Sequence, residues 1–390
     1  MPFEKYYQNF LAENPYPRQL RNYDIVGEES SSIYLRHGDR RLINFSSNDY
    51  LGLTKHPLLI ARSQEYAQRY GVGAASSRSV AGNLAIYAEL ENQLAQAVGK
   101  PAALILGSGY QTNISVLEAL LDAEVLTKKP LVFCDRYVHA SMLATTKHLA
   151  RILRFQHNDL EHLQILLEKY ADSDQPKFIL VESIYSMDGD QADLEKIIQL
   201  AKHYKALLYV DDAHAVGVYG KSGWGNVTAH SDGIDIVMGT FSKALGSYGA
   251  YIACSENMRD YLINKCRGLI YSTALSPAVL GAIAAAIELL PQLNQIREDL
   301  YRKANRVREF FKAEGLDCGS TDTHIIPWII GDAEKTLQIS AALEAQGILA
   351  ATIRPPTVPA GKSRVRFCLS AAHTDDDISE LLEAIKGRLG

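Results

Sequence analysis

Lys243 follows a short apolar run and two hydroxyl residues, in the stretch Ile236-Val-Met-Gly-Thr-Phe-Ser-Lys243. Such a run favours a strand buried on both faces. Open α/β sheets bind ligands at the carboxyl ends of their strands, and an amine partly desolvated there has a lowered pKa and can attack a carbonyl. The stretch therefore predicts a Schiff-base lysine, with hydroxyls at Thr240 and Ser242 to hold a phosphate. A solvated lysine at a helix start is the alternative.

A second motif, Leu207-Leu-Tyr-Val-Asp211-Asp-Ala-His214, supports this prediction. Asp211 ends an apolar run, and a buried carboxylate is costly without a cationic partner. The protonated pyridine nitrogen of pyridoxal phosphate (PLP) is such a partner, and this ion pair makes PLP a better electron sink. His214 is placed to hydrogen-bond the ring hydroxyl. The alternative is an aspartate that only caps the next turn.

Three other loops follow strand-like runs. Gly107-Ser108-Gly109-Tyr110 leads into a helix, where glycines and free N–H groups bind phosphate, although a plain turn is the alternative. His139 is placed to lie flat over the cofactor ring, or it is a core histidine. Ser186 is expected near the ring hydroxyl, and Glu182 is expected to contact the substrate.

Two further segments suit the recognition of small anions. Tyr271-Ser-Thr273 offers hydroxyls after an apolar run. Residues 354–366 are stiffened by three prolines and end in two alternating arginines. Arg364 and Arg366 are expected on one face of a strand, where a guanidinium fork holds a carboxylate. A solvated basic edge strand is the alternative.

The elements that position these residues alternate between strand and helix, which indicates a mostly parallel sheet covered by helices on both faces. The last two strands are joined too tightly for a helical crossover, so one of them is expected to be antiparallel. The expected strands are Ala102–Leu106, Leu131–Cys134, Arg151–Phe155, Phe178–Glu182, Leu207–Asp211, Ile236–Thr240 and Ala250–Cys254.

We expect three parts in the chain: an N-terminal arm with small strands (1–48), a large PLP-binding α/β domain (49–280) and a C-terminal α+β domain (281–390) that recruits the arm. A length of 390 residues is long for one domain. The C-terminal part should contain strands at 325–330 and 365–370 and helices at 337–346 and 375–386.

The composition excludes several classes of protein. A net charge of −5 gives no electrostatic footprint for nucleic acid, and no apolar run reaches the length of a membrane span. The N-terminus lacks the order of a signal peptide. Five scattered cysteines without a CxxC spacing argue against a disulfide frame or a metal site and favour the reducing cytoplasm.

Taken together and in order, these motifs resemble those of the α-oxoamine synthases, which are fold-type I PLP enzymes. The resemblance runs from about residue 20 to the end. The segment Arg354-Pro-Pro-Thr-Val-Pro359 is similar to the members that use L-alanine and a pimeloyl thioester. The matching motifs are Asn44-Phe-Ser-Ser-Asn-Asp-Tyr-Leu-Gly-Leu53, Ser77-Arg78 with Gly82, His139-Ala-Ser141, Ser186-Met-Asp-Gly189, Asp211-Asp-Ala-His214, Thr240-Phe-Ser-Lys243 and Tyr271-Ser-Thr273.

The resemblance implies a large domain with a seven-stranded, mostly parallel sheet, a smaller C-terminal α+β domain and a homodimer with shared active sites. It implies catalytic roles for Lys243, Asp211, His214 and His139. The implied cofactor contacts are Ser108, Gly109, Tyr110, His139, Ser186, Asp211, His214, Thr240, Lys243 and Thr273, the last lent by the second subunit. The implied substrate contacts are Arg21, Asn48, Glu182, Thr357 and Arg366.

The activity implied is the PLP-dependent decarboxylative condensation of L-alanine with a pimeloyl group carried by CoA or a carrier protein. Four departures leave the acyl-chain preference open: Ala75, Tyr87, Leu245 and Ala250 stand where glycine, histidine, phenylalanine and glycine are usual. The alternatives are a sister synthase (a glycine C-acetyltransferase or an aminoketone signal synthase), an aminotransferase on the same fold, and a non-catalytic subunit that has lost its cofactor.

Overall fold

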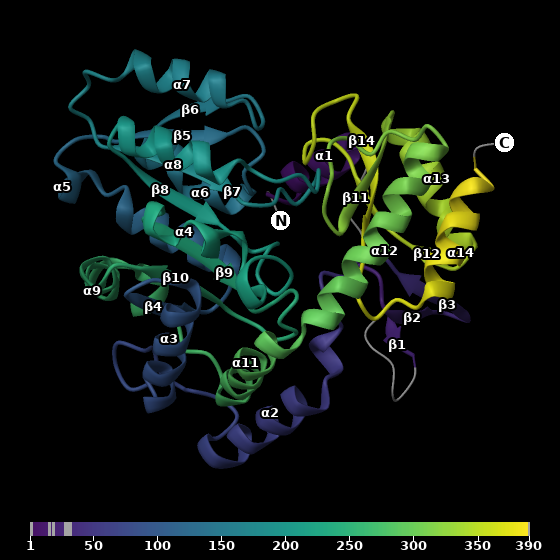
Figure 1. Cartoon of the computed structure of the whole chain (residues 1–390), viewed down its shortest axis with the longest axis horizontal. Helices are drawn as coiled ribbons and strands as arrows, with labels where there is room; N and C mark the ends of the chain where they lie inside the picture. The colour runs from purple at the N-terminus through teal and green to yellow at the C-terminus, as the bar shows by residue number, and fades with distance from the viewer. Residues whose placement is uncertain (1–2, 15–16, 18–19, 27–32, 389–390) are drawn as a thin grey trace.

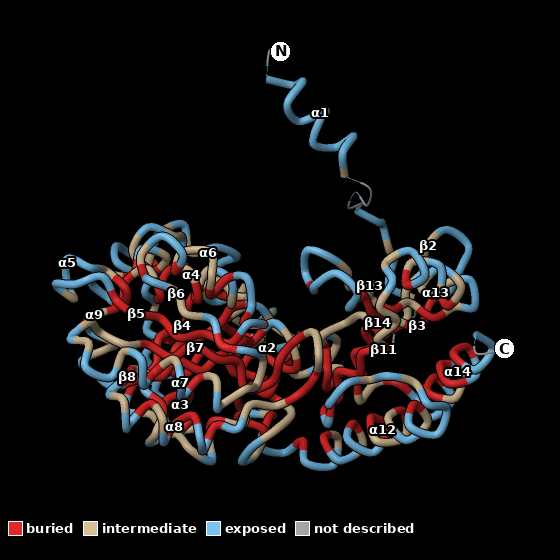
Figure 2. The backbone as a smooth tube through the Cα atoms, turned by 90° about the horizontal axis from the view of Figure 1, so that it is seen from above, coloured by how far each residue is buried: buried red, intermediate tan, exposed pale blue. Residues whose placement is uncertain are grey.

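The structure is a computed structural model, and it describes residues 3–14, 17, 20–26 and 33–388. A larger lobe contains the long sheet, and a smaller lobe contains the C-terminal helices, including α12, which packs against α14 (Figures 1 and 2). The helices are α1 (Glu4–Glu13), α2 (Pro57–Tyr70), α3 (Ala85–Val98), α4 (Gly109–Leu120), α5 (Ala123–Leu126), α6 (Ala140–Leu149), α7 (Leu160–Lys169), α8 (Leu194–His203), α9 (Glu256–Lys265), α10 (Arg267–Ile270), α11 (Pro277–Leu289), α12 (Asn294–Ala313), α13 (Ala333–Ala345) and α14 (Asp375–Lys386).

Within these residues the strands form three sheets, of seven, four and three strands. The seven-stranded sheet has the order β4-β10-β9-β8-β7-β5-β6, the four-stranded sheet β1-β2-β3-β12, and the three-stranded sheet β11-β14-β13. The strands are β1 (Asp24–Ile25), β2 (Tyr34–His37), β3 (Arg40–Asn44), β4 (Ala102–Leu106), β5 (Leu131–Asp135), β6 (Arg151–Phe155), β7 (Lys177–Glu182), β8 (Ala206–Asp211), β9 (Ile236–Thr240), β10 (Ala250–Cys254), β11 (Ile325–Gly331), β12 (Ile348–Leu349), β13 (Ala351–Ile353) and β14 (Ser363–Cys368).

The large sheet confirms the expected α/β fold, since all seven predicted strands are present. β10 is antiparallel to both of its neighbours, β4 and β9, as its short connection predicted. Alternate strand residues face opposite sides: Leu131 and Phe133 pack into one core, and Val132 and Cys134 into the other. Helices α3, α7, α8 and α11 supply side chains to the first core, and α4, α6, α9 and α10 to the second. Figure 2 shows this buried centre between exposed helices.

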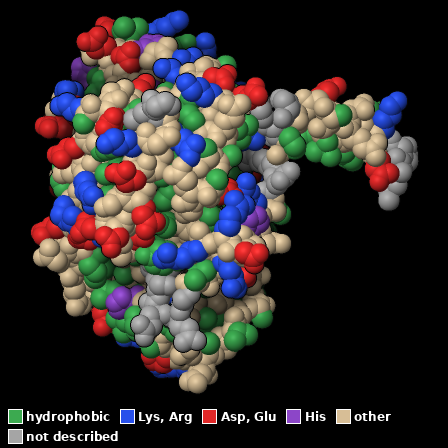
Figure 3. Space-filling view, turned by 90° about the vertical axis from the view of Figure 1, so that its right-hand side faces the viewer, with side chains coloured by type: hydrophobic (Ala, Val, Ile, Leu, Met, Phe, Trp, Pro, Cys, Tyr) green, Lys and Arg blue, Asp and Glu red, His purple; other side chains and the backbone are tan. Residues whose placement is uncertain are grey.

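The arm and the C-terminal region share a sheet, as predicted. β3 runs parallel to β12, with Ile43 opposite Ile348. Ahead of these strands, α1 has no buried residue and projects from the body (Figures 2 and 3). The expected domain division at 280/281 remains a prediction, and that position falls within α11, which packs against α2.

No single helix among the described residues is long and apolar enough to cross a membrane. α11 with its 3₁₀ extension and α12, bent by 77° from each other, pass that test of length and composition only as a pair.

Candidate active site

Register aligns the carboxyl ends of the central strands. Glu182 at the end of β7 pairs with Asp211 at the end of β8, and Asp211 pairs with Met238. On the other side, Ala250 pairs with both Leu106 and Thr240, so the ends of β4 and β9 also coincide. The loops after these strands therefore open onto one edge of the sheet.

At this edge a cavity of about 140 Å³ brings together most of the predicted cofactor residues. It is lined by Gly109, Tyr110, Asn113, His139, Ser141, Glu182, Asp211, Ala213, His214, Met238, Thr240 and Lys243. The lining does not include the predicted residues Arg21, Asn48, Ser108, Ser186, Thr273, Thr357 and Arg366.

Asp211 is 5% exposed and is held by two donors. The Asn113 side-chain amide donates to its Oδ2 at 2.8 Å, and the Ala213 backbone N–H donates to its Oδ1 at 3.1 Å. The Tyr209 hydroxyl in turn donates to the Asn113 carbonyl at 2.6 Å. The contact with the Ala213 N–H is the turn cap that the sequence left open as the alternative role of Asp211. The aspartate therefore caps its turn and also faces the cavity. A carboxylate can accept about four hydrogen bonds, so Asp211 retains capacity for a cation.

Lys243 lines the same cavity and is half-buried. Burial lowers the pKa of its amine to about 8, although the carboxyl groups of Asp211 and Glu182 oppose this shift. The amine is therefore substantially unprotonated slightly above neutral pH, as a nucleophile and base requires.

His214 is buried and neutral. Burial and the nearby charges of Lys243 and Arg366 lower its pKa well below the usual value. Its Nδ1 lies 2.7 Å from the Tyr50 hydroxyl, which donates to the Asn48 carbonyl at 3.1 Å. Because that hydroxyl has one proton, His214 Nδ1 must be the donor to Tyr50, which leaves Nε2 as an acceptor. Asn48 thus reaches the site through Tyr50.

His139 stands at the open side of the cavity. Its Nδ1 lies 2.7 Å from the Ser141 hydroxyl, and its ring meets the Tyr110 ring edge-on at 6.4 Å. Burial lowers its pKa, so it is also neutral near pH 7. It is not packed in a core, so the alternative of a core histidine is wrong.

Glu182 is the second buried carboxyl group of the cavity, 2% exposed. Burial and the neighbouring charge of Asp211 raise its pKa well above the usual value. Its Oε1 has no hydrogen-bond partner. Glu182 is therefore the neutral acid beside Asp211.

The loop after β4 has the features of a phosphate site. The Ser108 hydroxyl caps α4 by accepting from the Gln111 N–H at 3.2 Å. A Cβ added to Gly109 would lie 3.9 Å from Thr240 Oγ1, so the helix N-terminus faces that hydroxyl across the cavity. These groups fit PLP. The N–H groups at the helix start and the facing hydroxyl match its phosphate, the Lys243 amine matches its aldehyde, and the Asp211 carboxylate matches its ring nitrogen.

Arg366 and Ser186 form the opposite wall of the candidate site, outside the cavity lining but close enough for the Arg366 charge to lower the pKa of Lys243 and His214. Arg366, 9% exposed, donates from Nη1 to the Ser186 carbonyl at 2.9 Å, and its Nε has no partner. Arg364, 1% exposed, donates to Asp188 at 2.5 Å and to the Met187 carbonyl at 3.1 Å. Both arginines reach the same turn, and β14 is the central strand of its sheet. The alternative of a solvated basic edge strand is therefore wrong.

Three predicted residues lie further from the cavity. Thr273 is exposed and pairs with Ser77 beside a small pocket that Gly107 also lines. Arg21 is half-exposed and bonds Glu344 at 2.5 Å. Thr357 is exposed at the edge of a groove between α1 and the 352–357 segment.

The sequence interpretation missed three contributors: Asn113, Ser141 and Tyr50. Asn113 and Ser141 lie near recognised residues, four positions after Gly109 and two after His139. Tyr50 lies in a recognised motif, but its contact with His214 spans 164 positions. No local pattern predicts such a contact.

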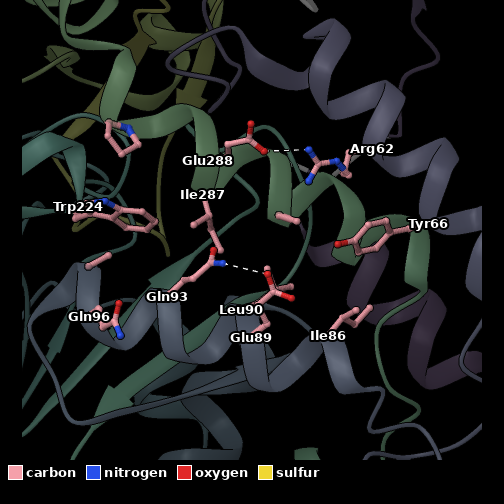
Figure 4. A pocket seen from close by; sticks show the side chains of 13 residues that line it. Arg62, Tyr66, Ile86, Glu89, Leu90, Gln93, Gln96, Trp224, Ile287 and Glu288 are labelled. Atoms are coloured by element: carbon pink, nitrogen blue, oxygen red, sulfur yellow. Dashed lines mark hydrogen bonds and ion pairs between the residues drawn. The ribbon is translucent and has the colours of Figure 1, made fainter.

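A roomier hollow of about 600 Å³ lies between α2, α3 and α11 (Figure 4). Arg62 and Glu288 in its lining form an ion pair at 3.0 Å, and the rest of the lining mixes apolar side chains with glutamine and glutamate. It contains none of the residues predicted to do chemistry.

Comparison with known families and proteins agrees with this geometry. The aminotransferase class I and II family matches residues 40–385. A Magnetococcus marinus protein provisionally named 8-amino-7-oxononanoate synthase is 50% identical, covering 97% of this chain and 96% of its own. The Gluconacetobacter diazotrophicus 8-amino-7-oxononanoate synthase is 43% identical, covering 98% and 97%.

Among solved structures, a serine palmitoyltransferase variant of S. paucimobilis with a bound PLP–myriocin aldimine superposes with a TM-score of 0.88 at 27% identity, covering 94% of this chain and 92% of its own. The Francisella tularensis 8-amino-7-oxononanoate synthase has a TM-score of 0.77 at 26% identity, covering 89% and 98%.

Proposed function

The chain belongs to the aminotransferase class I and II family and, within it, to the PLP-dependent α-oxoamine synthases; on that premise we propose that it makes 8-amino-7-oxononanoate, an early intermediate of biotin biosynthesis. The substrates are L-alanine and a pimeloyl thioester of CoA or a carrier protein. A carbon–carbon bond forms between the alanine α-carbon and the thioester carbonyl carbon, the thiol leaves, and the alanine carboxyl group leaves as CO₂.

PLP, when bound, supplies the electron sink that stabilises negative charge at the amino-acid α-carbon. Lys243 would hold its aldehyde, and Asp211 would keep a proton on its ring nitrogen. Ser108, Gly109, Tyr110 and Thr240 bind its phosphate, while Ser186 and His214 bind near its ring oxygen.

Lys243 Nζ is the group that moves the α-proton. Its pKa of about 8 matches this task, because a base works best when its pKa lies near the working pH. His139, at the open side, is placed to donate toward the thioester oxygen as charge develops there. Arg366 binds the alanine carboxylate through the guanidinium face that the Ser186 carbonyl leaves unused.

The acyl side is proposed from fewer contacts. Arg21, Asn48, Glu182 and Thr357 are the substrate-binding residues that we assign there. Arg21 must leave Glu344 to do so, and the loss of such a half-exposed ion pair costs little.

We also infer a homodimer in which Thr273 completes the partner's phosphate site. Thr273 is exposed and lies outside its own subunit's cavity, which supports this arrangement. Tyr271, two residues earlier, is 77% exposed. All five cysteines, each within the described residues, are free thiols, which favours a cytoplasmic enzyme.

The single observation that carries the reaction class is the cavity that joins an amine of lowered pKa to a carboxylate with spare acceptor capacity. An activity matrix tests the substrates: L-alanine, glycine and L-serine against pimeloyl-CoA, acetyl-CoA and palmitoyl-CoA, with released thiol and CO₂ measured. Turnover that requires L-alanine and a pimeloyl thioester supports the proposal. Turnover with serine and palmitoyl-CoA would favour the reaction named for the serine palmitoyltransferase neighbours.

A further inference from the structure

His157, two residues after β6, lies between two carboxylates. Its Nδ1 is 2.9 Å from Asp135 Oδ1, and its Nε2 is 2.9 Å from Asp190 Oδ2. Ionised carboxylate oxygens only accept hydrogen bonds, so both ring nitrogens must donate and the ring is an imidazolium. Its ring packs against Tyr137 and Tyr185, each with centroids 4.5 Å away. The side chain is 18% exposed.

The next residue repeats the same connection. The Asn158 backbone N–H donates to Asp135 Oδ2 at 2.8 Å, and its side-chain amide donates to Asp190 Oδ2 at 2.7 Å. Two successive residues after β6 thus bind the same two carboxylates. The arrangement is a tether between the loop after β5 and the loop after β7.

Each tethered carboxylate begins or ends a loop of the candidate site. Asp135 opens the loop that carries His139. Asp190 closes the turn at 186–189, where its carbonyl accepts from the Tyr185 N–H at 3.0 Å. Neither carboxylate lines the cavity itself.

The 186–189 turn is held from the other side by the C-terminal region. Arg366 donates to the Ser186 carbonyl, and Thr321 and Thr323 donate to the Gly189 carbonyl at 3.1 and 2.7 Å. A Cβ at Gly189 would lie 2.0 Å from the Ile325 carbonyl oxygen, so the turn is packed tightly against β11. The 186–189 turn therefore connects His157 to Arg366, because contacts on both of its sides fix its position.

We propose that His157 is a positioning residue that fixes the His139 loop and the Arg366-supporting turn relative to each other. It touches neither substrate nor cofactor. It sets where the carboxylate-binding guanidinium stands with respect to the cofactor residues. The inference deepens the proposed function and rests on it.

The charge of the ring has a measurable signature. Burial lowers the pKa of His157, but hydrogen bonds and charges from Asp135 and Asp190 outweigh burial and raise it to about 10. An unfolded histidine titrates at about 6.5. The stabilisation from the imidazolium is therefore fully present below pH 6.5 and is lost as the pH rises toward 10. The other titratable groups against the ring are the phenols of Tyr137 and Tyr185, and burial raises the pKa of Tyr185 well above its usual value.

The first test compares the thermal unfolding of the PLP-loaded wild type with that of His157→Gln from pH 6 to pH 10. The Tm deficit of the variant should be largest at pH 6 and should shrink steadily toward pH 10. His148→Gln, an exposed histidine on α6, is the matched control and should show no deficit. A deficit that is constant with pH would mean a neutral, merely packed ring and would overturn the proposal.

The second test measures positioning. His157→Gln should weaken the binding of L-alanine, followed by the visible absorbance of the bound cofactor, by about tenfold, the size of one charge-assisted hydrogen bond. KM for L-alanine should rise by the same factor, while kcat stays within about threefold. Unchanged binding beside a pH-dependent Tm deficit would make His157 structural only and overturn the positioning role.

A second variant covers the case in which His157→Gln does not fold. Asp190→Asn removes one of the two acceptor charges and should weaken L-alanine binding by about threefold, while unchanged binding contradicts the proposal. If the wild type itself does not bind L-alanine, the proposed substrate is wrong, and the pH dependence of Tm still tests the tether.

Discussion

The two walls of the candidate site differ in what holds their side chains. On the large-domain wall, Asp211, Thr240 and Lys243 lie at or within three residues of strand ends that pair in register. On the opposite wall, Arg366 reaches the site from another sheet and is anchored to a turn at 186–189. The residues proposed for cofactor chemistry therefore lie along one sheet edge, whereas the residue proposed for substrate recognition is held by contacts with the 186–189 turn. Substitutions at the sheet edge should therefore lower kcat, and substitutions on the opposite wall should raise KM for L-alanine.

The largest effect should come from Lys243→Ala. Loss of the amine removes both the covalent hold on the cofactor and the base, so turnover should fall by roughly 10³-fold or more. Thiol release measures the loss. The control is Lys265→Ala on α9, which removes only an ion pair with Asp122 and should retain activity.

In the wild-type apoprotein, covalent loading of PLP should accelerate as the pH rises through about 8, where the Lys243 amine loses its proton. Loading with no pH dependence between 7 and 9 would contradict this.

Asp211→Asn should come second, with kcat lower by roughly 10²-fold, because the amide cannot hold the ring proton. The adjacent Asp212 sharpens the comparison. Burial raises the pKa of Asp212 to about 8, so it is already largely neutral at pH 7. Asp212→Asn should therefore leave kcat at pH 7 within about threefold of wild type. Equal losses in the two variants would show that Asp211 has no special electrostatic role.

On the opposite wall, Arg366→Lys should raise KM for L-alanine by roughly ten- to a hundredfold, because an ammonium cannot reproduce a bidentate fork. Its neighbour Arg364 is buried against Asp188, so Arg364→Lys should lower Tm while changing KM less. Steady-state kinetics and thermal unfolding of both variants separate these outcomes. A large fall in kcat with unchanged KM for Arg366→Lys would place that residue on the chemical side of the site.

The smallest effect should come from Arg21→Ala on the arm. Its pair with Glu344 is half-exposed, so loss should cost less than about 1 kcal/mol of stability. KM for the pimeloyl thioester should rise by about threefold, with KM for L-alanine unchanged. Arg36→Ala, an exposed arginine on β2, is the control. An unchanged acyl KM would remove Arg21 from the substrate set.

The sequence predicted the large-domain wall better than the opposite one, for physical reasons. Apolar runs such as Ile236–Thr240 predict buried strands from local sequence alone. Pairing of these strands in register then brings their ends together. The short β12 and β13 were missed because strands of two and three residues form only by pairing with distant chain.

His157 illustrates what a local pattern cannot predict. The stretch His157-Asn-Asp159 ends in an aspartate that caps α7, so it is typical of an ordinary turn before a helix. Its charged state depends on Asp135 and Asp190, which lie 22 and 33 positions away in the chain. The neutral state of His214 depends equally on distant groups. Residue type alone says only that a histidine can titrate, and the fold determines the direction in which its pKa shifts.

The pairing of β3 with β12 has a consequence for the order of folding. The Ile43 N–H donates to the Gly347 carbonyl at 2.7 Å, and the Phe45 N–H donates to the Leu349 carbonyl at 2.8 Å, so each contact spans about 300 residues. During synthesis, β1, β2 and β3 can pair with one another, but the edge of β3 that faces β12 must wait until nearly the whole chain has left the ribosome. The seven-stranded sheet needs nothing beyond residue 254. The segment around Asn48 and Tyr50, which orients His214, is therefore among the last to settle, and a truncated nascent chain has its central sheet without a finished active site.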